Sequence, residues 1–314
     1  MNEFNDIIVA IHCLAYNHES YIRECLEGFV MQQTNFRFVA IVHDDASTDK
    51  TADIIREYEA KYPEIIKPIY ETENQYSKRD GTIDRIMNEA IAATSAKYVA
   101  ICEGDDYWTD PLKLQKQVDI LEKDETLMAC VTNCSVVDDK GKTIKEIRGG
   151  VVKDDIEGRY DLRHFFNDNH QYPTLSAVYR NSHPKEVGEK TKIMSNPYLG
   201  DWTLWIALHC YGDFYFLNEI TCAYRINPTS LTHSNTIKRR IGLAKENFRL
   251  LPAVASVLPE GFEDIQKDLR DNTAWIWWDL GHAYFKAHKY FKALWCLFRC
   301  GLKSPSYLLK SMMK

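Results

Sequence analysis

Short apolar runs alternate with amphipathic segments along the first third of the chain. The runs are rich in Val, Ile and Ala, which is typical of strands buried on both faces of a parallel sheet. The segments between them carry apolar residues at helical spacing, which predicts helices with one buried face, the first of them capped by Ser20. The pattern predicts strands at 7–14, 38–42, 65–70 and 98–102, and helices at 22–30, 51–61 and 82–94. Strands alternating with helices in this order predict a βαβ arrangement with a parallel sheet.

The rest of the chain is less regular and ends in a helical region. One helix is predicted after Pro111 and ends at about residue 123, and a second spans 201–211. Strands are predicted at 127–137 and 173–180, and everything from residue 238 onward is predicted to be helical. The polar stretch 140–160 is predicted to be loop or sheet edge. We therefore expect a nucleotide-binding half at 1–110, an acceptor-binding half at 111–235, and a helical extension at 236–314.

Two of the predicted strands end in acidic loops. Strand 98–102 runs into Glu103, Gly104, Asp105 and Asp106, and strand 38–42 leads to His43, Asp44 and Asp45. Ligands of open α/β sheets bind beyond the carboxyl ends of the strands. Clustered carboxylates repel one another unless a cation lies between them, and their oxygen ligands favour Mg²⁺ or Mn²⁺. Because such ions usually bind phosphates as well, the pattern also favours a phosphate-bearing ligand.

The alternative interpretation is structural. An acidic loop can simply close a strand, and Ser47 and Thr48 are good N-cap residues for the helix that follows them. This alternative explains Asp44 and Asp45 less well, because both precede the cap position.

Composition places the chain among ordinary globular proteins. It has 314 residues, of which 45% are hydrophobic and 27% charged, enough for one large α/β domain and an appendage. Its nine cysteines form no CxxC pair, and those inside apolar runs are expected to be buried thiols of a reducing cytoplasm. No signal peptide and no apolar run of about 20 residues is seen, so we expect a cytoplasmic protein.

The net charge of −6 is unevenly distributed. The segment 236–314 carries a balance of +7, the remainder −13, and no acidic residue follows Asp279. A basic C-terminal surface predicts contact with something anionic. Nucleic acid is not expected as a partner, because the predicted site at the strand ends is acidic and would repel phosphate in the absence of metal.

Five motifs in a fixed order resemble family 2 glycosyltransferases of the GT-A fold, of the bacterial polysaccharide type. The match covers about residues 7–235, with motifs beginning at Cys13, Asp44 (a DDxSTDxT motif), Glu103 (a DxD motif), Gly200 and Tyr224. The resemblance implies a Rossmann-like, mixed and mostly parallel sheet flanked by helices. Three departures stand out: Glu103 where many relatives have Asp, Asn88 in a segment that lacks the family's Arg, and Asn227 in place of a histidine.

The resemblance also implies roles for residues. The donor would be a nucleotide-diphosphate sugar, with Asp45, or Asp44 as second choice, accepting an N–H of uracil. Asp105 would be the principal ligand of Mn²⁺ or Mg²⁺. The remaining donor-site residues implied are Ala15, Tyr16, Asn17, Glu19, Asn88, Glu103, Gly104 and Arg225, and the further metal ligands are Asp106 and His233.

Asp201 would be the general base of an inverting transfer to a hydroxyl of a glycan or a lipid-linked acceptor, with Gly200 and Trp202 shaping the acceptor site. The structural alternative makes Asp201 the N-cap of a helix. A sugar-nucleotide nucleotidyltransferase is the competing enzyme class, but loop 13–20 lacks the glycines it would need. A carbohydrate-binding module without activity is the non-enzymatic alternative.

The aromatic C-terminal segment resembles a single TPR-like helical hairpin. Residues 280–314 combine aromatic and basic side chains. They are predicted either to touch an anionic membrane at the inner face of the cytoplasmic membrane, or to pack their aromatic rings on the catalytic domain.

Overall fold

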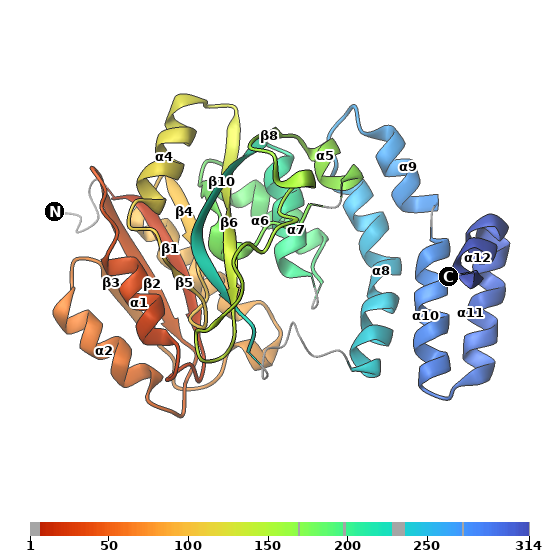
Figure 1. Ribbon diagram of the computed structural model, residues 1–314, viewed down its shortest axis with the longest axis horizontal. Helices are drawn as coiled ribbons and strands as arrows, with labels where there is room; N and C mark the ends of the chain where they lie inside the picture. The colour runs from red at the N-terminus through yellow and green to blue at the C-terminus, as the bar shows by residue number, and fades with distance from the viewer. Residues whose placement is uncertain (1–6, 169, 197–198, 228–235, 272, 314) are drawn as a thin grey trace. The chain divides into compact units, whose positions relative to one another are not determined.

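The structure is a computed structural model that describes residues 7–168, 170–196, 199–227, 236–271 and 273–313 (Figure 1). The chain forms two compact units. One contains Met1–Pro184 and Tyr211–Asn227, and the other contains Lys185–Cys210 and Pro228–Lys314.

The first unit is built on a single mixed sheet. Its strand order is β3-β2-β1-β4-β9-β6-β10-β5, with β7 added to β6 and β8 to β10. Strands β3, β2, β1 and β4 are mutually parallel, and β6 and β10 are parallel to each other. The short antiparallel strand β9 lies between β4 and β6, so the carboxyl ends of β4 and β6 reach the same edge. The strands are β1 Ile7–Ala15, β2 Arg37–Asp44, β3 Ile66–Tyr70, β4 Tyr98–Ile101, β5 Tyr107–Trp108, β6 Leu127–Val137, β7 Thr143–Lys145, β8 Gly158–Tyr160, β9 Val178–Arg180 and β10 Asp213–Arg225.

Helices cover both faces of this sheet. Alternate residues of β1 face opposite sides, as the period of a strand requires. Val9, Ile11 and Cys13 pack with the buried faces of α1, α2 and α4, whereas Ala10 packs with α3. These helices are α1 Ile22–Val30, α2 Thr51–Lys61, α3 Thr82–Thr94 and α4 Lys113–Lys123, and a short α5 spans Leu162–Asn167. The α/β architecture predicted from the sequence is therefore confirmed.

Helix ends and one strand differ from the predictions. Ser20 does not cap α1: the N-cap residue is Tyr21, and the N–H of Ile22 bonds to the carbonyl of His18. Helix α2 starts after Lys50 rather than from a Ser47 or Thr48 cap. The predicted strand 173–180 is mostly a 3₁₀ turn, because the Ser176 hydroxyl and N–H both bond to the Pro173 carbonyl, and only its last three residues pair in the sheet.

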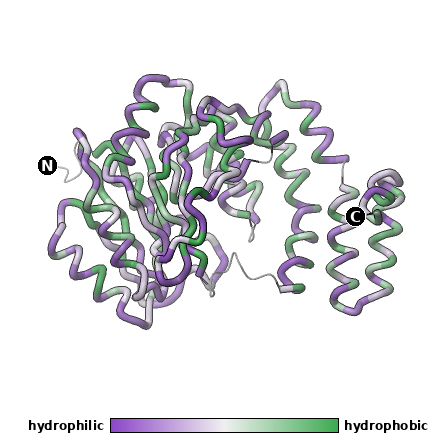
Figure 2. The backbone as a smooth tube through the Cα atoms, viewed as in Figure 1, coloured by the Kyte–Doolittle hydropathy of each residue, from purple (hydrophilic) through white to green (hydrophobic). Residues whose placement is uncertain are grey.

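The second unit is helical. It holds α7 Gly200–His209, α8 Ile237–Val257, α9 Glu263–Asp271, α10 Ala274–Lys286, α11 Tyr290–Lys303 and α12 Pro305–Met312, and α6 Pro184–Ile193 leads into it. Helices α10 and α11 pack closely at Gly281, where an added Cβ would lie 3.2 Å from the Cβ of Cys296. Along the helices, hydrophobic and hydrophilic segments alternate (Figure 2). None of the described helices combines the length and apolarity needed to cross a bilayer.

These units divide the chain differently from the predicted segments. Strands from both 1–110 and 111–235 share one sheet, and residues 185–210 group with the C-terminal helices. The assignment of the first two segments to donor and acceptor binding stays a prediction.

Candidate functional site

The two acidic loops lie on either side of β1, at the carboxyl edge of the sheet. In the β1–β2 ladder Ala15 pairs with Asp44, and in the β1–β4 ladder His12 pairs with Ile101. Both acidic segments therefore leave the sheet beside the end of β1. Parallel pairing brings together residues that are far apart in the sequence, and this is the edge at which α/β proteins bind ligands.

The loop after β1 and the loop after β2 are joined by hydrogen bonds. The N–H of Asn17 donates to the Ser47 hydroxyl at 2.9 Å, and the Asn17 side-chain oxygen accepts the N–H of Thr48 at 2.8 Å. Two further bonds link Glu19 to the second loop: its N–H donates to Asp49 at 3.0 Å, and its carboxylate accepts the N–H of Lys50 at 3.1 Å. Asn17 and Glu19, predicted as donor contacts, thus hold the shape of this edge.

Asn17 itself adopts the left-handed backbone conformation, with φ of 54°. Asn tolerates this conformation better than most residues. Beside it, the Tyr16 ring is 44% exposed and Ala15 is buried, so an aromatic surface is open to solvent above the strand ends.

Asp44 and Asp45 are both buried but differ in their partners. The two carboxylate oxygens of Asp45 accept the N–H groups of Gln75 and Tyr76 at 2.6 and 3.0 Å, which fixes the loop after β3. The Oδ2 atom of Asp44 is 3.4 Å from the N–H of Ser47, and its buried Oδ1 atom has no hydrogen-bond partner among the described residues. A buried oxygen without a partner is costly unless a ligand or water satisfies it.

The second acidic loop passes very close to the first strand. Gly104 allows this close approach, because a Cβ added to it would lie 2.9 Å from Nδ1 of His18 and 3.1 Å from the Cβ of Ala15. The N–H of Gly104 donates to the Leu14 carbonyl at 2.9 Å. Burial lowers the pKa of His18, while the charges of Asp105 and Asp49 oppose that shift. The imidazole is therefore an electrostatic neighbour of Asp105.

Arg225, at the end of β10, clamps the acidic loop from the other side. Its side chain is 1% exposed and donates to the backbone carbonyls of Asp105 at 2.8 Å and Asp138 at 3.2 Å, and to the Glu24 carboxylate. The guanidinium also lies over the rings of Tyr21 and Tyr107, at 4.8 and 5.3 Å from their centroids. Arg225, predicted as a donor contact, thus positions the acidic loop.

The carboxylates of the DxD-like loop are not equivalent. Asp106 is buried, and its Oδ1 accepts the backbone N–H of Arg225 at 2.7 Å. Burial, with the neighbouring charge of Asp105, raises the pKa of Asp106 well above its ordinary value. Asp105 and Glu103 are partly exposed.

The loop offers carboxylate oxygens to a divalent ion but no complete metal site. Within the described ranges, no group of three or more His, Cys, Asp or Glu side chains is arranged to hold a metal. Mg²⁺ and similar ions often take only one or two protein carboxylates and complete their coordination with substrate phosphates and water. Asp105, being partly exposed, fits that role, whereas Asp106 is already used inside the protein.

The remaining predicted residues lie elsewhere. Asn88 is on the exposed side of α3. Gly200, Asp201 and Trp202 form the first turn of α7 in the other unit, where Asp201 is exposed and its Oδ1 is 2.8 Å from the N–H of Trp202. The N-cap of α7 is Leu199, so the structural alternative in which Asp201 caps the helix is wrong, and its role as a base stays a prediction. His233 falls outside the described residues.

Sequence reasoning missed the partners of Arg225. Tyr21 and Glu24 come from the start of α1 and Asp138 from the turn after β6, and Glu24 is 201 positions from Arg225. Only Asp138 carried a signal, as part of a turn sequence, and that signal concerned the turn.

Comparisons with known proteins place this arrangement in a family. The sequence profile described as "Glycosyl transferase family 2" matches residues 11–184. An uncharacterized protein of Mycobacterium tuberculosis is 30% identical over 276 residues, which are 87% of this chain and 75% of that protein.

Solved structures agree on the fold. S. aureus TarS 1–349 in complex with UDP-GlcNAc is similar at a TM-score of 0.57 and 14% identity, covering 95% of this chain and 92% of that chain. The mannosyltransferase PcManGT from Pyrobaculum calidifontis, in complex with GDP-Man and Mn²⁺, is similar at a TM-score of 0.54 and 14% identity, covering 99% and 85%. The expected GT-A-like architecture with a C-terminal helical region is confirmed. With a profile match over more than half of its length, the chain belongs to glycosyl transferase family 2.

Proposed function

We propose that this protein transfers a sugar from a nucleotide-diphosphate donor, a UDP-sugar, to a hydroxyl group of a glycan or lipid-linked acceptor in the synthesis of a cell-surface polysaccharide. The observation that carries the proposal is the pair of acidic loops flanking β1, with the unpartnered oxygen of Asp44 on one side and the partly exposed Asp105 on the other. The UDP-GlcNAc in the structure of TarS and the GDP-Man in that of PcManGT support a nucleotide-diphosphate sugar as the donor class.

The base of the nucleotide is assigned to the β1–β2 side of the edge. The N–H of a uracil ring would satisfy Oδ1 of Asp44, and the exposed Tyr16 ring offers a surface for stacking. Asp45 acts indirectly, because it holds the loop at Gln75 and Tyr76. The family resemblance implies Asp45 as the first choice for this contact with uracil and Asp44 as the second; the proposal reverses that order.

The diphosphate is assigned to Asp105. A Mn²⁺ or Mg²⁺ ion bound there would neutralise the charge that develops on the leaving diphosphate. Glu103 is a second carboxylate on the same loop, and Asp106 with Arg225 keeps the loop in place.

The acceptor hydroxyl is assigned to Asp201. As that oxygen bonds to the anomeric carbon and the bond to the diphosphate breaks, its proton passes to the Asp201 carboxylate. Attack from the face opposite the diphosphate inverts the configuration. Asp201 is exposed at the start of α7 and is accessible for this task. His233 is kept as a candidate metal ligand, and Gly200 and Trp202 as acceptor contacts.

A donor screen for nucleotide release tests the proposal. We expect release from a UDP-sugar with Mn²⁺ or Mg²⁺ and an acceptor, and its loss after chelation or in Asp105→Asn. Asp201→Asn should retain nucleotide binding but lose transfer. The matched control, Asp139→Asn, changes an exposed carboxylate in the turn after β6 and should leave both unchanged. Full transfer by Asp201→Asn, or transfer in the presence of chelator, would contradict these roles.

We further propose that the C-terminal helices contact an anionic membrane that carries the acceptor. Helix α11 has two opposite apolar faces: Ala293, Cys296 and Cys300 are buried, and a second set is exposed. The exposed fractions are 92% for Phe291, 64% for Leu294, 54% for Trp295, 56% for Phe298 and 66% for Leu302. At about 100° per residue these five positions share one side of the helix.

Basic residues flank this apolar side. Lys292, Arg299 and Lys303 lie on one border of it, and Leu309 and Met312 of α12 add further exposed apolar groups. An apolar strip beside cations, without any acidic residue after Asp279, is typical of a helix that lies in a lipid headgroup region.

Vesicle co-sedimentation tests the membrane contact. The protein should pellet with phosphatidylglycerol vesicles and much less with phosphatidylcholine vesicles. A variant with Lys289, Lys292 and Lys303 changed to Glu should lose this binding, whereas the control with Lys185, Lys192 and Lys267 changed to Glu has the same net charge and should retain it. If both variants pellet alike, the membrane contact is wrong. A self-association abolished by Phe291→Gln, with no lipid binding, would assign the face to a second copy instead.

A further inference from the structure

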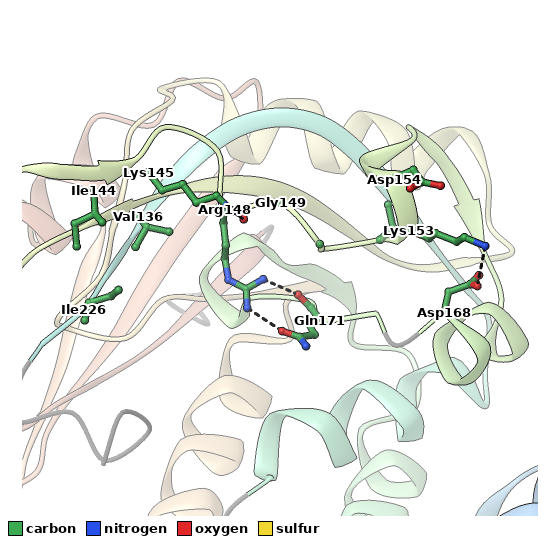
Figure 3. A pocket seen from close by; sticks show the side chains of 12 residues that line it. Val136, Ile144, Lys145, Arg148, Gly149, Lys153, Asp154, Asp168, Gln171 and Ile226 are labelled. Atoms are coloured by element: carbon green, nitrogen blue, oxygen red, sulfur yellow. Dashed lines mark hydrogen bonds and ion pairs between the residues drawn. The ribbon is translucent and has the colours of Figure 1, made fainter. Parts of the chain in front are cut away.

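A cavity lies beside β6 and the residue that follows Arg225 at the end of β10, two strands that are separated from β1 and β2 in the order of the sheet. Its volume is about 590 Å³, within the range of small-molecule sites. It is lined by the ends of β6 and β10, the strand β7 and the loops that follow (Figure 3). Val136 and Ile226 form part of its wall, and Ile226 directly follows Arg225. The N–H of Ile226 donates to the Val137 carbonyl at 2.9 Å, so this wall is continuous with the sheet edge that carries the acidic loop.

The cavity carries more basic than acidic side chains. Lys145, Arg148 and Lys153 line it together with Asp154 and Asp168. Lys153 lies 3.6 Å from Asp168, and these two charges offset each other. The carboxylate of Asp155, next to the lining, accepts the N–H of Gly150 at 3.3 Å.

The two other cations have neutral partners. The guanidinium of Arg148 donates to the backbone carbonyl of Gln171 at 3.2 Å and to its side-chain oxygen at 3.4 Å, as Figure 3 shows. The ammonium of Lys145 donates to the carbonyl of Arg148. The guanidinium of Arg148 is turned toward Gln171 and the ammonium of Lys145 lies at the Arg148 backbone (Figure 3), so each cation lacks, among the described residues, a charged partner that an anion in the cavity could supply.

Several other arginines of the same unit form ion pairs, whereas Arg180 donates to backbone carbonyls and to the Tyr98 hydroxyl. Arg23 pairs with Glu57, and Arg159 pairs with Asp124 and Asp213. Among the described residues, Arg148 differs from Arg23 and Arg159 in donating its planar fork to neutral oxygens of Gln171, and from Arg180 in lining a cavity. That fork matches the geometry of a carboxylate or a phosphate.

The walls suit the remainder of such a ligand. Val136, Ile144, Val152 and Ile226 are apolar lining residues, and a sugar ring can pack its C–H faces on surfaces of this kind. The turn at Gly149 and Gly150, with φ of 65° and 71°, leaves the space beside Gly150 open, since a Cβ there would meet nothing within 4 Å.

We propose that this cavity is an acceptor subsite that binds the anionic group of an acidic glycan, through Arg148 and Lys145. The inference rests on the proposed transferase function, and it adds the chemical class of the acceptor. The anion is either the carboxylate of a uronic acid or a phosphate ester, because both offer paired oxygens to the guanidinium. The donor nucleotide is assigned to the separate loops beside β1.

Calorimetric titration with small probes tests the subsite in the full-length protein. Glucuronate and glycerol 3-phosphate are the anionic probes, and glucose and glycerol are their neutral counterparts. We expect at least one anion to bind about tenfold or more tightly than its neutral counterpart, and the stronger of the two identifies the type of anion. In Arg148→Gln with Lys145→Gln the affinity for the anion should fall about tenfold or more, to that of the neutral counterpart, as for loss of hydrogen bonds to a charged group.

Two controls separate this inference from the proposed function. Lys142→Gln removes an exposed cation from the same hairpin outside the cavity and should leave probe binding unchanged. UDP binding should be the same in the wild type and the double variant. Arg148→Lys keeps the positive charge but loses the planar fork, so its affinity for the anionic probe should lie between those of the wild type and the double variant. This variant tests the subsite even if the double variant fails to fold.

Equal binding of anionic and neutral probes would overturn the subsite. Loss of UDP binding together with anion binding would also overturn it, because the cavity would then belong to the donor site. A wild type that binds anions but no nucleotide would instead contradict the proposed transferase function.

Discussion

Replacing Arg225 with Met should loosen the acidic loop that carries Asp105. The guanidinium is buried and donates to two backbone carbonyls, those of Asp105 and Asp138. Each bond from a charged donor contributes about 1.5–3 kcal/mol, and its loss leaves a carbonyl unsatisfied. The third partner, Glu24, is 51% exposed, so that ion pair adds at most about 1 kcal/mol. Contacts of Met with the rings of Tyr21 and Tyr107 would recover about 1–2 kcal/mol.

The net cost is about 4 kcal/mol, close to the cost of breaking a buried ion pair. The chain has two compact units, so a single unfolding curve would mix their transitions. Hydrogen exchange reports local opening instead. Amides of 103–107 should exchange about a thousandfold faster in Arg225→Met, and nucleotide binding should weaken. Helices α10 and α11, in the other unit, are the internal control and should not change.

Exchange at 103–107 within threefold of the wild type, together with unchanged nucleotide binding, would contradict the role of Arg225 in holding this loop. Arg225→Lys sharpens the comparison. Lysine keeps the charge, but its single ammonium group can reach only some of the oxygens that the guanidinium contacts. The exchange rate at 103–107 in Arg225→Lys should therefore fall between those of the wild type and Arg225→Met.

Three further changes have expected outcomes, and in each the unfolding transition is that of the unit carrying the changed residue, followed by a probe confined to that unit. Gly104→Ala should cost about 1–3 kcal/mol of stability by overpacking against the end of β1, which is measured as a lowered Tm. The control Gly188→Ala in α6, with open space around it, should be neutral or stabilising. Equal changes of Tm in the two variants would argue against the close approach at Gly104. Asn17→Ala should lower the Tm and Asn17→Gly should lower it less, because Gly accepts the left-handed backbone; the reverse order would count against this account. Burial lowers the pKa of His170 to about 4, so the neutral form is favoured in the folded state. The stability that this group contributes is then present above its ordinary pKa of 6.5 and is lost as the pH falls toward 4, by about 3 kcal/mol. In His170→Gln the urea midpoint of unfolding should depend less on pH over that range. An unchanged dependence on pH would show that other groups dominate.

Local patterning was enough for the strands β1, β2 and β4 and for the acidic loops that follow two of them. The strands β1, β2 and β4 were readable because each is a continuous apolar run, and parallel βαβ connections bring their carboxyl ends to one edge. The helix caps were not readable: Ser20 and Ser47 are suitable residues, but competing bonds in the tertiary structure decided where α1 and α2 begin.

The roles of the site residues depended on long-range contacts. Asp105 and Asp106 are equivalent in the sequence, yet only Asp106 receives the N–H of Arg225, which lies 119 positions away. In the same way, Asp45 is occupied by the loop at Gln75, while Asp44 keeps an unpartnered oxygen.

By itself, the sequence determined the α/β class, the family motifs and the two acidic strand ends, because these depend on periodicity and on residues adjacent in the chain. Only the tertiary structure decided which carboxylates are occupied, that Arg225 serves as a clamp, and that Lys145 and Arg148 face a cavity. The physical reason is that burial and hydrogen-bond partners come from segments brought together by the sheet, and no local pattern records which segments those are.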